Sequence, residues 1–133
     1  MVSVNLLNDT YARIKNAYKL HLDQVFVLKS KKTVKVLDVL YLEGFIRGYS
    51  VNSSKPNNIA VFLKYSSNGE SVIKNIWGIS KPGKGVYASV PELWSLYKKS
   101  GMCCYIVSTS KGVVSLSQAL QLNVGGKLLC GVA

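Results

Sequence analysis

The first apolar residues of the chain recur at helical spacing. Four of them are separated by four, three and four residues and so share one helix face: Leu7, Tyr11, Ile14 and Tyr18. Asn5 is a residue type that caps helices, so the helix is predicted to start there. Arg13, Lys15 and Asn16 fall largely on the other faces, and we expect them to face solvent or a partner.

Short apolar runs separated by turn-forming residues follow this helix. A strand is predicted over 25–27, then a helix that starts after Ser30 and stops at Gly44, then strands over 45–51 and 59–65. The Asn-Ser-Ser-Lys-Pro-Asn-Asn stretch between the last two strands has the composition of a turn. The first half of the chain is therefore predicted to run α-β-α-β-β.

The pattern becomes mostly strand-like after a small polar linker at 66–69. Pro91 suits the first turn of a short helix that Gly101 would end, and Ser115-x-x-Gln118 resembles a capping box for a last helical turn or two. Four strands are expected in this half, over 72–79, 86–90, 103–107 and 127–132.

The predicted fold class is α+β with two small halves. An α-β-α-β-β amino-terminal half spans 1–66, and a mostly β carboxy-terminal half with short helices spans 70–133. The 133 residues fit one domain or two small halves that share an interface. Hydrophobic residues make up 48% of the chain, enough to form a core, and no apolar run approaches the roughly 20 residues of a bilayer-crossing helix.

Net charge adds the strongest functional indication. The chain has 17 Lys and Arg against 6 Asp and Glu, a formal net charge of +11. No acidic side chain follows Glu92, so the last four lysines have no acidic neighbour in sequence: Lys98, Lys99, Lys111 and Lys127. This favours a polyanionic partner, nucleic acid, over a merely solvated surface, and over an anionic membrane because no basic amphipathic helix stands out.

Three hydroxyls and an ammonium leave a buried-type strand together at Ser108, Thr109, Ser110 and Lys111, before Gly112. Such groups can bond phosphate, ribose or base edges of RNA. The alternative is a surface turn that its own Ser and Thr side chains stabilise. The residue types leave both interpretations open.

Two further segments could add to an RNA site. Lys81 and Lys84 flank a Pro-Gly turn that could grip a phosphate, and Tyr87 beside it could stack on a base. Gly125 and Gly126 allow either a close backbone approach or a turn, and we favour the turn. Trp77, Trp94 and most tyrosines are spaced as core residues.

Catalytic and metal-binding patterns are weak. His21 is the only histidine, the carboxylates are scattered, and no Walker or Rossmann glycine loop is present. Cys103, Cys104 and Cys130 lack metal-ligand spacing, and we expect reduced, buried thiols. We therefore predict no enzyme, no cofactor, no metal and no small-molecule substrate. The alternative of another class is a thiol-dependent enzyme that uses Cys103 or Cys104.

Read in order, six segments resemble the small ribosomal subunit protein eight family, from about Asn5 to the end. They are Ala12-Arg13-Ile14-Lys15-Asn16-Ala17, Ser30-Lys31 with Glu43-Gly44-Phe45-Ile46, Phe62-Leu63-Lys64-Tyr65, Ile79-Ser80-Lys81-Pro82-Gly83, Ser108-Thr109-Ser110-Lys111-Gly112-Val113 and Gly125-Gly126. Each segment is a weak signal, but the shared order and spacing are specific. Gly85 and Lys127 stand where the family usually has Arg and Glu.

The resemblance implies a structural protein that binds the central domain of small-subunit rRNA early in assembly. It implies that the Ser108–Ser110 loop enters an rRNA minor groove with Lys111, Gly125, Gly126 and Lys127 nearby. Arg13, Lys15, Asn16 and Lys31 would meet a second rRNA segment or a neighbouring ribosomal protein. A messenger-RNA-binding translation regulator would use the same surface and remains an alternative.

Fifteen lysines against two arginines suggest an A/T-rich genome. The amino terminus also shows no Arg-rich presequence. Together these features favour a ribosomal protein encoded in a mitochondrion, with a bacterial cytoplasm or a plastid as alternatives.

Overall fold

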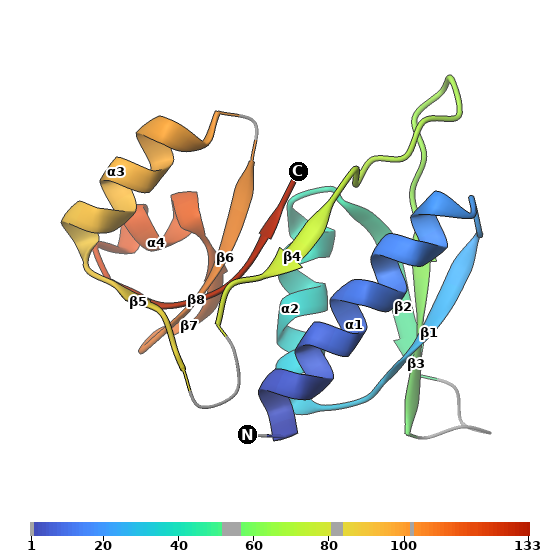
Figure 1. Cartoon of the computed structure of the whole chain (residues 1–133), viewed down its shortest axis with the longest axis horizontal. Helices are drawn as coiled ribbons and strands as arrows, with labels where there is room; N and C mark the ends of the chain where they lie inside the picture. The colour runs from blue at the N-terminus through green and yellow to red at the C-terminus, as the bar shows by residue number, and fades with distance from the viewer. Residues whose placement is uncertain (1, 52–56, 81–83, 102) are drawn as a thin grey trace.

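The computed structural model describes residues 2–51, 57–80, 84–101 and 103–133, and its two halves lie side by side (Figure 1). The amino-terminal half contains α1 (Val2–Lys19), β1 (Gln24–Leu28), α2 (Lys31–Leu42), β2 (Ile46–Val51) and β3 (Asn58–Leu63). The strands form an antiparallel sheet in the order β1-β3-β2. The predicted α-β-α-β-β order and the α+β class are confirmed.

Local sequence signals set most of the boundaries in this half. The Ser30 hydroxyl caps α2 by accepting a hydrogen bond from the Thr33 amide at 3.1 Å. Gly44 follows the end of α2 with a φ of 81°, the left-handed conformation that glycine adopts without strain. Asn5 lies inside α1 and does not start it, so that prediction was wrong.

The carboxy-terminal half contains β4 (Ile76–Gly78), β5 (Tyr87–Ala88), α3 (Val90–Ser100), β6 (Cys104–Thr109), β7 (Gly112–Ser115), α4 (Leu116–Leu122) and β8 (Gly126–Val132). Its second sheet runs β4-β8-β6-β7, and β5 pairs with β8. Ser115 caps α4 by accepting a hydrogen bond from the Gln118 amide, as predicted. The strand expected over 72–79 is only three residues long, and β7 was not predicted.

Apolar side chains form two clusters. The larger one holds the predicted face of α1, the inward residues of α2 and the first sheet, and also residues of the second half: Ile73, Ile76, Ile106, Leu129, Cys130 and Val132. The smaller cluster lies between α3, α4 and the second sheet, around Leu93, Val107 and Leu128. The two halves therefore share one core, and a second core belongs to the carboxy-terminal half alone. Among the described residues no helix is long and apolar enough to cross a membrane.

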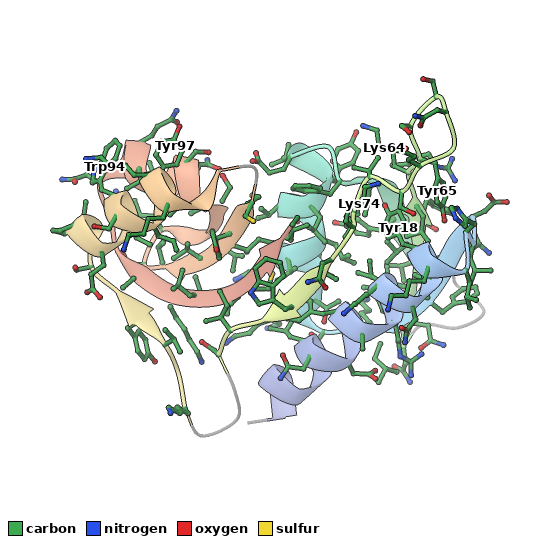
Figure 2. All side chains as sticks on the ribbon, turned by 45° about the horizontal axis from the view of Figure 1, so that its top comes forward. Tyr18, Lys64, Tyr65, Lys74, Trp94 and Tyr97 are labelled. Atoms are coloured by element: carbon green, nitrogen blue, oxygen red, sulfur yellow. The ribbon has the colours of Figure 1, made fainter. Side chains whose placement is uncertain are left out.

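Tyr18 ties α1 to the first sheet through its hydroxyl. The hydroxyl donates to the Phe45 carbonyl at 2.7 Å and accepts from the Lys64 amide at 3.1 Å, so it bonds the chain just outside β2 and β3. Figure 2 shows Tyr18, Lys64 and Tyr65 together at this end of the molecule, and the Tyr18 and Tyr65 rings meet edge to face at 5.5 Å. Burial raises the pKa of Tyr18 to about 12, so the hydroxyl keeps its proton at physiological pH.

We expect Tyr18→Phe to lower the free energy of unfolding by roughly 1–2 kcal/mol, because it removes the buried hydroxyl that bonds the partly buried Phe45 carbonyl and Lys64 amide. Urea denaturation followed by circular dichroism measures the change. Tyr41→Phe removes the same hydroxyl from a ring that is 54% exposed and should change stability by less than about 0.5 kcal/mol. Equal effects of the two substitutions would show that the Tyr18 bonds do not stabilise the fold.

Candidate nucleic-acid interface

The register of the second sheet aligns three of the predicted site residues in one row. Tyr87 of β5 lies opposite Lys127 of β8, and Lys127 lies opposite Ser108 of β6. Directly opposed residues of antiparallel strands point to the same face. Their neighbours Val107 and Leu128 belong to the core beneath α3 and α4, so the row points to the opposite face of the sheet.

The three side chains of the row differ in their exposure to solvent. Tyr87 is 71% exposed, and Ser108 and Lys127 are half-buried. A Cβ at Gly85 would touch both the Tyr87 ring and the aliphatic chain of Lys127, which shows that these two side chains lie against the Gly85 backbone. An aromatic ring, an ammonium and a hydroxyl therefore share one face.

The predicted Ser-Thr-Ser loop is the tip of the β6–β7 hairpin. Ser108 and Thr109 are the last residues of β6, Ser110 and Lys111 form the turn, and Gly112 starts β7 with a φ of 119°. The Thr109 hydroxyl donates to the Gly112 carbonyl at 2.8 Å and accepts from the Lys111 amide at 3.1 Å. The Thr109 side chain thus stabilises its own turn, which is the alternative that the sequence analysis had left open for this loop.

The other two hydroxyls of the hairpin have a different role. Within the described ranges, neither Ser108 nor Ser110 makes a side-chain hydrogen bond, and Ser110 and Lys111 are exposed. One hydroxyl thus holds the turn, and the two on either side of it in sequence keep their donors and acceptors available. A rigid tip with available hydroxyls and an ammonium can bond phosphate or ribose.

Gly125 and Gly126 permit close backbone approach, and the turn interpretation was wrong. A Cβ at Gly126 would overlap the Ser108 carbonyl oxygen, and one at Gly125 would overlap the Ala88 carbonyl oxygen. The turn before them is made by Asn123, which ends α4 in the left-handed conformation. The glycines therefore bring β8 against β5 and β6, and this contact places Lys127 between Tyr87 and Ser108.

Buried Ser80 bonds to β8 just before the predicted basic turn. Its hydroxyl donates to the Leu128 carbonyl at 2.6 Å and accepts from the Val86 amide at 3.1 Å. Both ends of the 80–86 segment are thus fastened to β8. Lys84 is exposed on this segment, whereas the predicted contact at Lys81 lies outside the described residues. No local pattern predicts the Ser80 bonds, because the partners of this hydroxyl are 6 and 48 residues away.

The predicted site residues of α1 lie outside this row. The Arg13 guanidinium is bonded to the Asp9 carboxylate at 2.8 Å and to the Phe26 carbonyl at 3.3 Å, so α1 and β1 already engage it. Asn16 is exposed, and Lys15 is half-buried beside Lys19 and Lys74. The structure assigns Arg13 a stabilising contact and leaves Lys15 and Asn16 open to a partner.

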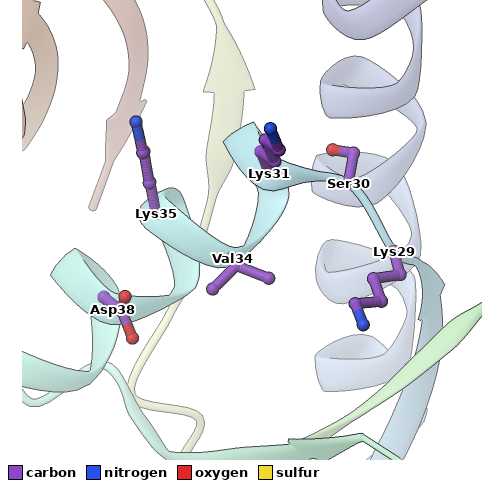
Figure 3. A pocket seen from close by; sticks show the side chains of 6 residues that line it. All are labelled: Lys29, Ser30, Lys31, Val34, Lys35 and Asp38. Carbon is purple, nitrogen blue, oxygen red and sulfur yellow. The ribbon is translucent and has the colours of Figure 1, made fainter.

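Lys31 starts α2 at the rim of a shallow hollow of 610 Å³. Figure 3 shows two further lysines of the lining, Lys29 and Lys35, and its other members are Ser30, Val34 and Asp38. The three lysines lie in or just before the first two turns of the helix, where backbone amides also favour anions, and Asp38 lies two turns from its start. This second basic surface belongs to the amino-terminal half.

Two of the three thiols, those of Cys104 and Cys130, are held in their protonated form. Burial raises the pKa of Cys130 and that of Cys104 to about 12, and the Glu43 carboxylate, which accepts a weak hydrogen bond from the Cys104 thiol, adds to the latter shift. Both stay protonated near neutral pH and are poor nucleophiles. Within the described part of the chain, no three His, Cys, Asp or Glu side chains come together as metal ligands would.

Comparison with known proteins identifies the family of this chain. The family model described as Ribosomal protein S8 matches residues 5–133. Small ribosomal subunit protein uS8 of Orientia tsutsugamushi (strain Boryong) is 42% identical over 128 residues, 95% of each chain. The proteins of that name from Rickettsia typhi and Acholeplasma laidlawii are 44% and 41% identical, over 93% and 99% of each chain.

These matches cover nearly the whole chain, and at this identity they show the family. They overturn the alternative of a thiol-dependent enzyme, as the protonated cysteines also indicate. The chain belongs to the ribosomal protein S8 family and is a non-enzymatic structural protein of the small ribosomal subunit.

Proposed function

We propose that the chain binds small-subunit rRNA through the row and the hairpin tip, and supports assembly of the subunit. The observation that carries this proposal is the alignment of Tyr87, Lys127 and Ser108 across three strands, with Ser110 and Lys111 at the adjoining tip. An aromatic ring, ammonium groups and small hydroxyls converge there from segments that are distant in sequence. Membership of the S8 family supports rRNA and neighbouring small-subunit proteins as the partners.

The geometry suits the minor groove of an RNA duplex. That groove is wide and shallow and displays 2′-hydroxyls, so a thin hairpin tip with serine hydroxyls reaches it without a probing helix. Lys111 and Lys127 supply attraction to the flanking phosphates, which is independent of sequence. Lys127 stands where the family usually has Glu, so we propose a phosphate contact there in place of an accepted hydrogen bond.

The basic surface around Lys31, with Lys15 and Asn16, would take a second rRNA segment or a neighbouring protein. Its lysines lie on α1, on α2 and just before α2, whereas the first contact lies on the second sheet. By resemblance to the family, the rRNA segments belong to the central domain of the small-subunit rRNA.

Ser110→Ala should weaken binding to the cognate rRNA stem by about 1 kcal/mol, roughly fivefold, since it removes a hydroxyl that has no role inside the protein. Filter binding with a transcript of that stem measures the loss. Ser95→Ala removes an exposed hydroxyl from α3 and serves as the matched control. Unchanged affinity of Ser110→Ala would refute the role of this hydroxyl.

The salt dependence of binding should identify the lysines that contact phosphate. Lys111→Gln and Lys127→Gln should each reduce the slope of log affinity against log salt concentration by about 0.9. The control is Lys74→Gln, because the Lys74 ammonium faces the Glu70 carboxylate at 3.5 Å and should leave the slope unchanged. Slopes that match the wild type in both test variants would exclude these phosphate contacts.

We further propose that the ribosome in question is mitochondrial. The preference for lysine over arginine, fifteen to two, supports an A/T-rich coding sequence of the kind that organelle genomes carry. Sucrose-gradient fractionation of purified organelles, with peptides of this chain followed by mass spectrometry, tests the location. The chain should sediment with the mitochondrial small subunit, and its recovery only with cytoplasmic or plastid ribosomes would refute the proposal.

A further inference from the structure

A groove between α3 and α4 is separate from every surface considered so far. Its walls are Trp94 and Tyr97 of α3 and Ser117, Leu120 and Gln121 of α4, and its volume is 320 Å³. Both helices pack on the face of the second sheet that carries Val107 and Leu128. The groove is thus on the opposite side of the sheet from the row of Tyr87, Lys127 and Ser108.

The aromatic residues of the groove are half in solvent. Trp94 is 46% exposed and Tyr97 is 50% exposed, although the sequence pattern had favoured a core position for the tryptophan. Their rings meet edge to face, with centroids 6.0 Å apart and planes at 88°. Figure 2 shows both at the outer side of α3, at the end of the molecule opposite Tyr18 and Tyr65. This arrangement keeps part of the indole accessible to a flat ligand.

Positive charge adjoins the groove at Lys98, which lies one helical turn after Trp94 on the same side of α3. Lys98 and Lys99 are both exposed in the last turn of the helix. Glu92 is the only acidic side chain between residues 71 and 133. Its carboxylate accepts hydrogen bonds from the Ser89 amide and hydroxyl at the start of α3, at 3.2 and 2.9 Å. The Glu92 carboxylate is therefore held at the start of α3, about 9 Å along the helix axis from Lys98, and does not pair with it.

We propose that this groove binds one unpaired RNA nucleotide, whose base stacks on Trp94 while Lys98, one turn further along the same side of α3, contacts its phosphate. The Gln121 amide and the Ser117 hydroxyl, both exposed on α4, offer donors and acceptors to the edge of the base. Aromatic stacking with adjacent cations is the usual way in which proteins hold single-stranded RNA. The inference rests on the proposed rRNA-binding function, since it adds a single-stranded contact to the proposed duplex contact.

The size of the groove favours a nucleotide over a protein partner. Its volume lies at the lower end of the range for small-molecule sites. A stable protein interface covers about 800 Å² on each partner. The described residues of this half include only two other exposed large apolar side chains, Tyr87 on β5 and Leu122 at the end of α4, so the apolar surface around the groove is too small for such an interface. A compact aromatic site beside Lys98 fits a single base with its phosphate.

The test uses a fluorescein-labelled RNA hexamer of alternating adenosine and cytidine, which cannot pair with itself, and measures anisotropy at low salt. Trp94→Ala should weaken binding on the order of tenfold, and Trp94→Phe should stay within about threefold of the wild type because it retains a stacking ring. Lys98→Gln should lower the salt slope by about 0.7. Circular dichroism checks that every variant is folded.

Two controls separate this site from the duplex contact. Tyr41→Ala, which removes another half-exposed ring, and Ser110→Ala should leave hexamer binding unchanged. Trp94→Ala should in turn leave binding to the isolated rRNA stem unchanged. Loss of stem binding in Ser110→Ala together with an unaffected hexamer affinity in Trp94→Ala would overturn the groove alone, and the reverse result would overturn the duplex contact alone.

Further outcomes would contradict the proposal. Absence of hexamer binding to the wild-type protein would overturn it. So would competition by hexaglutamate as strong as that by unlabelled hexamer, because the groove would then recognise negative charge, as on an acidic protein segment, without reading a base.

Discussion

The pairing of β8 with three other strands is the constraint on which the rest of this structure depends. β8 bonds to β4, β5 and β6, and its side chains enter both cores: Leu129, Cys130 and Val132 the shared one, Leu128 the smaller one. The register shifts between Ile106 and Val107, so Leu129 has no directly opposed residue in β6. This bulge permits one strand to serve two cores on different sides. Without β8, neither the shared core nor the second sheet would close.

The proposed RNA contact is a consequence of the same strand. Because Gly126 has no side chain, β8 approaches the Ser108 carbonyl closely, and the next residue, Lys127, falls between Tyr87 and Ser108. The hydroxyl of buried Ser80 ties the basic segment to the same strand. The bonds that hold the sheet therefore also fix the spacing of the groups for which we propose an RNA contact.

The two faces of the second sheet have different chemistry. One face carries small hydroxyls, a tyrosine and lysines on a rigid sheet and hairpin, which suits the regular surface of a duplex. The other is covered by α3 and α4, which leave a compact aromatic groove on their outer side, with Lys98 one turn beyond Trp94. Early assembly of a ribosomal subunit brings paired and unpaired RNA together, and a protein that holds both kinds at once would fix their relative position.

The sequence by itself determined the fold class, the face of α1, the caps at Ser30 and Ser115 and the basic carboxy-terminal half, because each follows from local periodicity, capping chemistry or charge. Its order of short motifs also indicated the family. The residue types left two possibilities for the hairpin hydroxyls, and the structure has Thr109 bonded to its own turn. The tertiary structure alone decided that Gly126 permits strand contact and that Trp94 is half exposed. These depend on which strands pair and how closely, and such contacts join residues far apart in the chain, where local patterns carry no information.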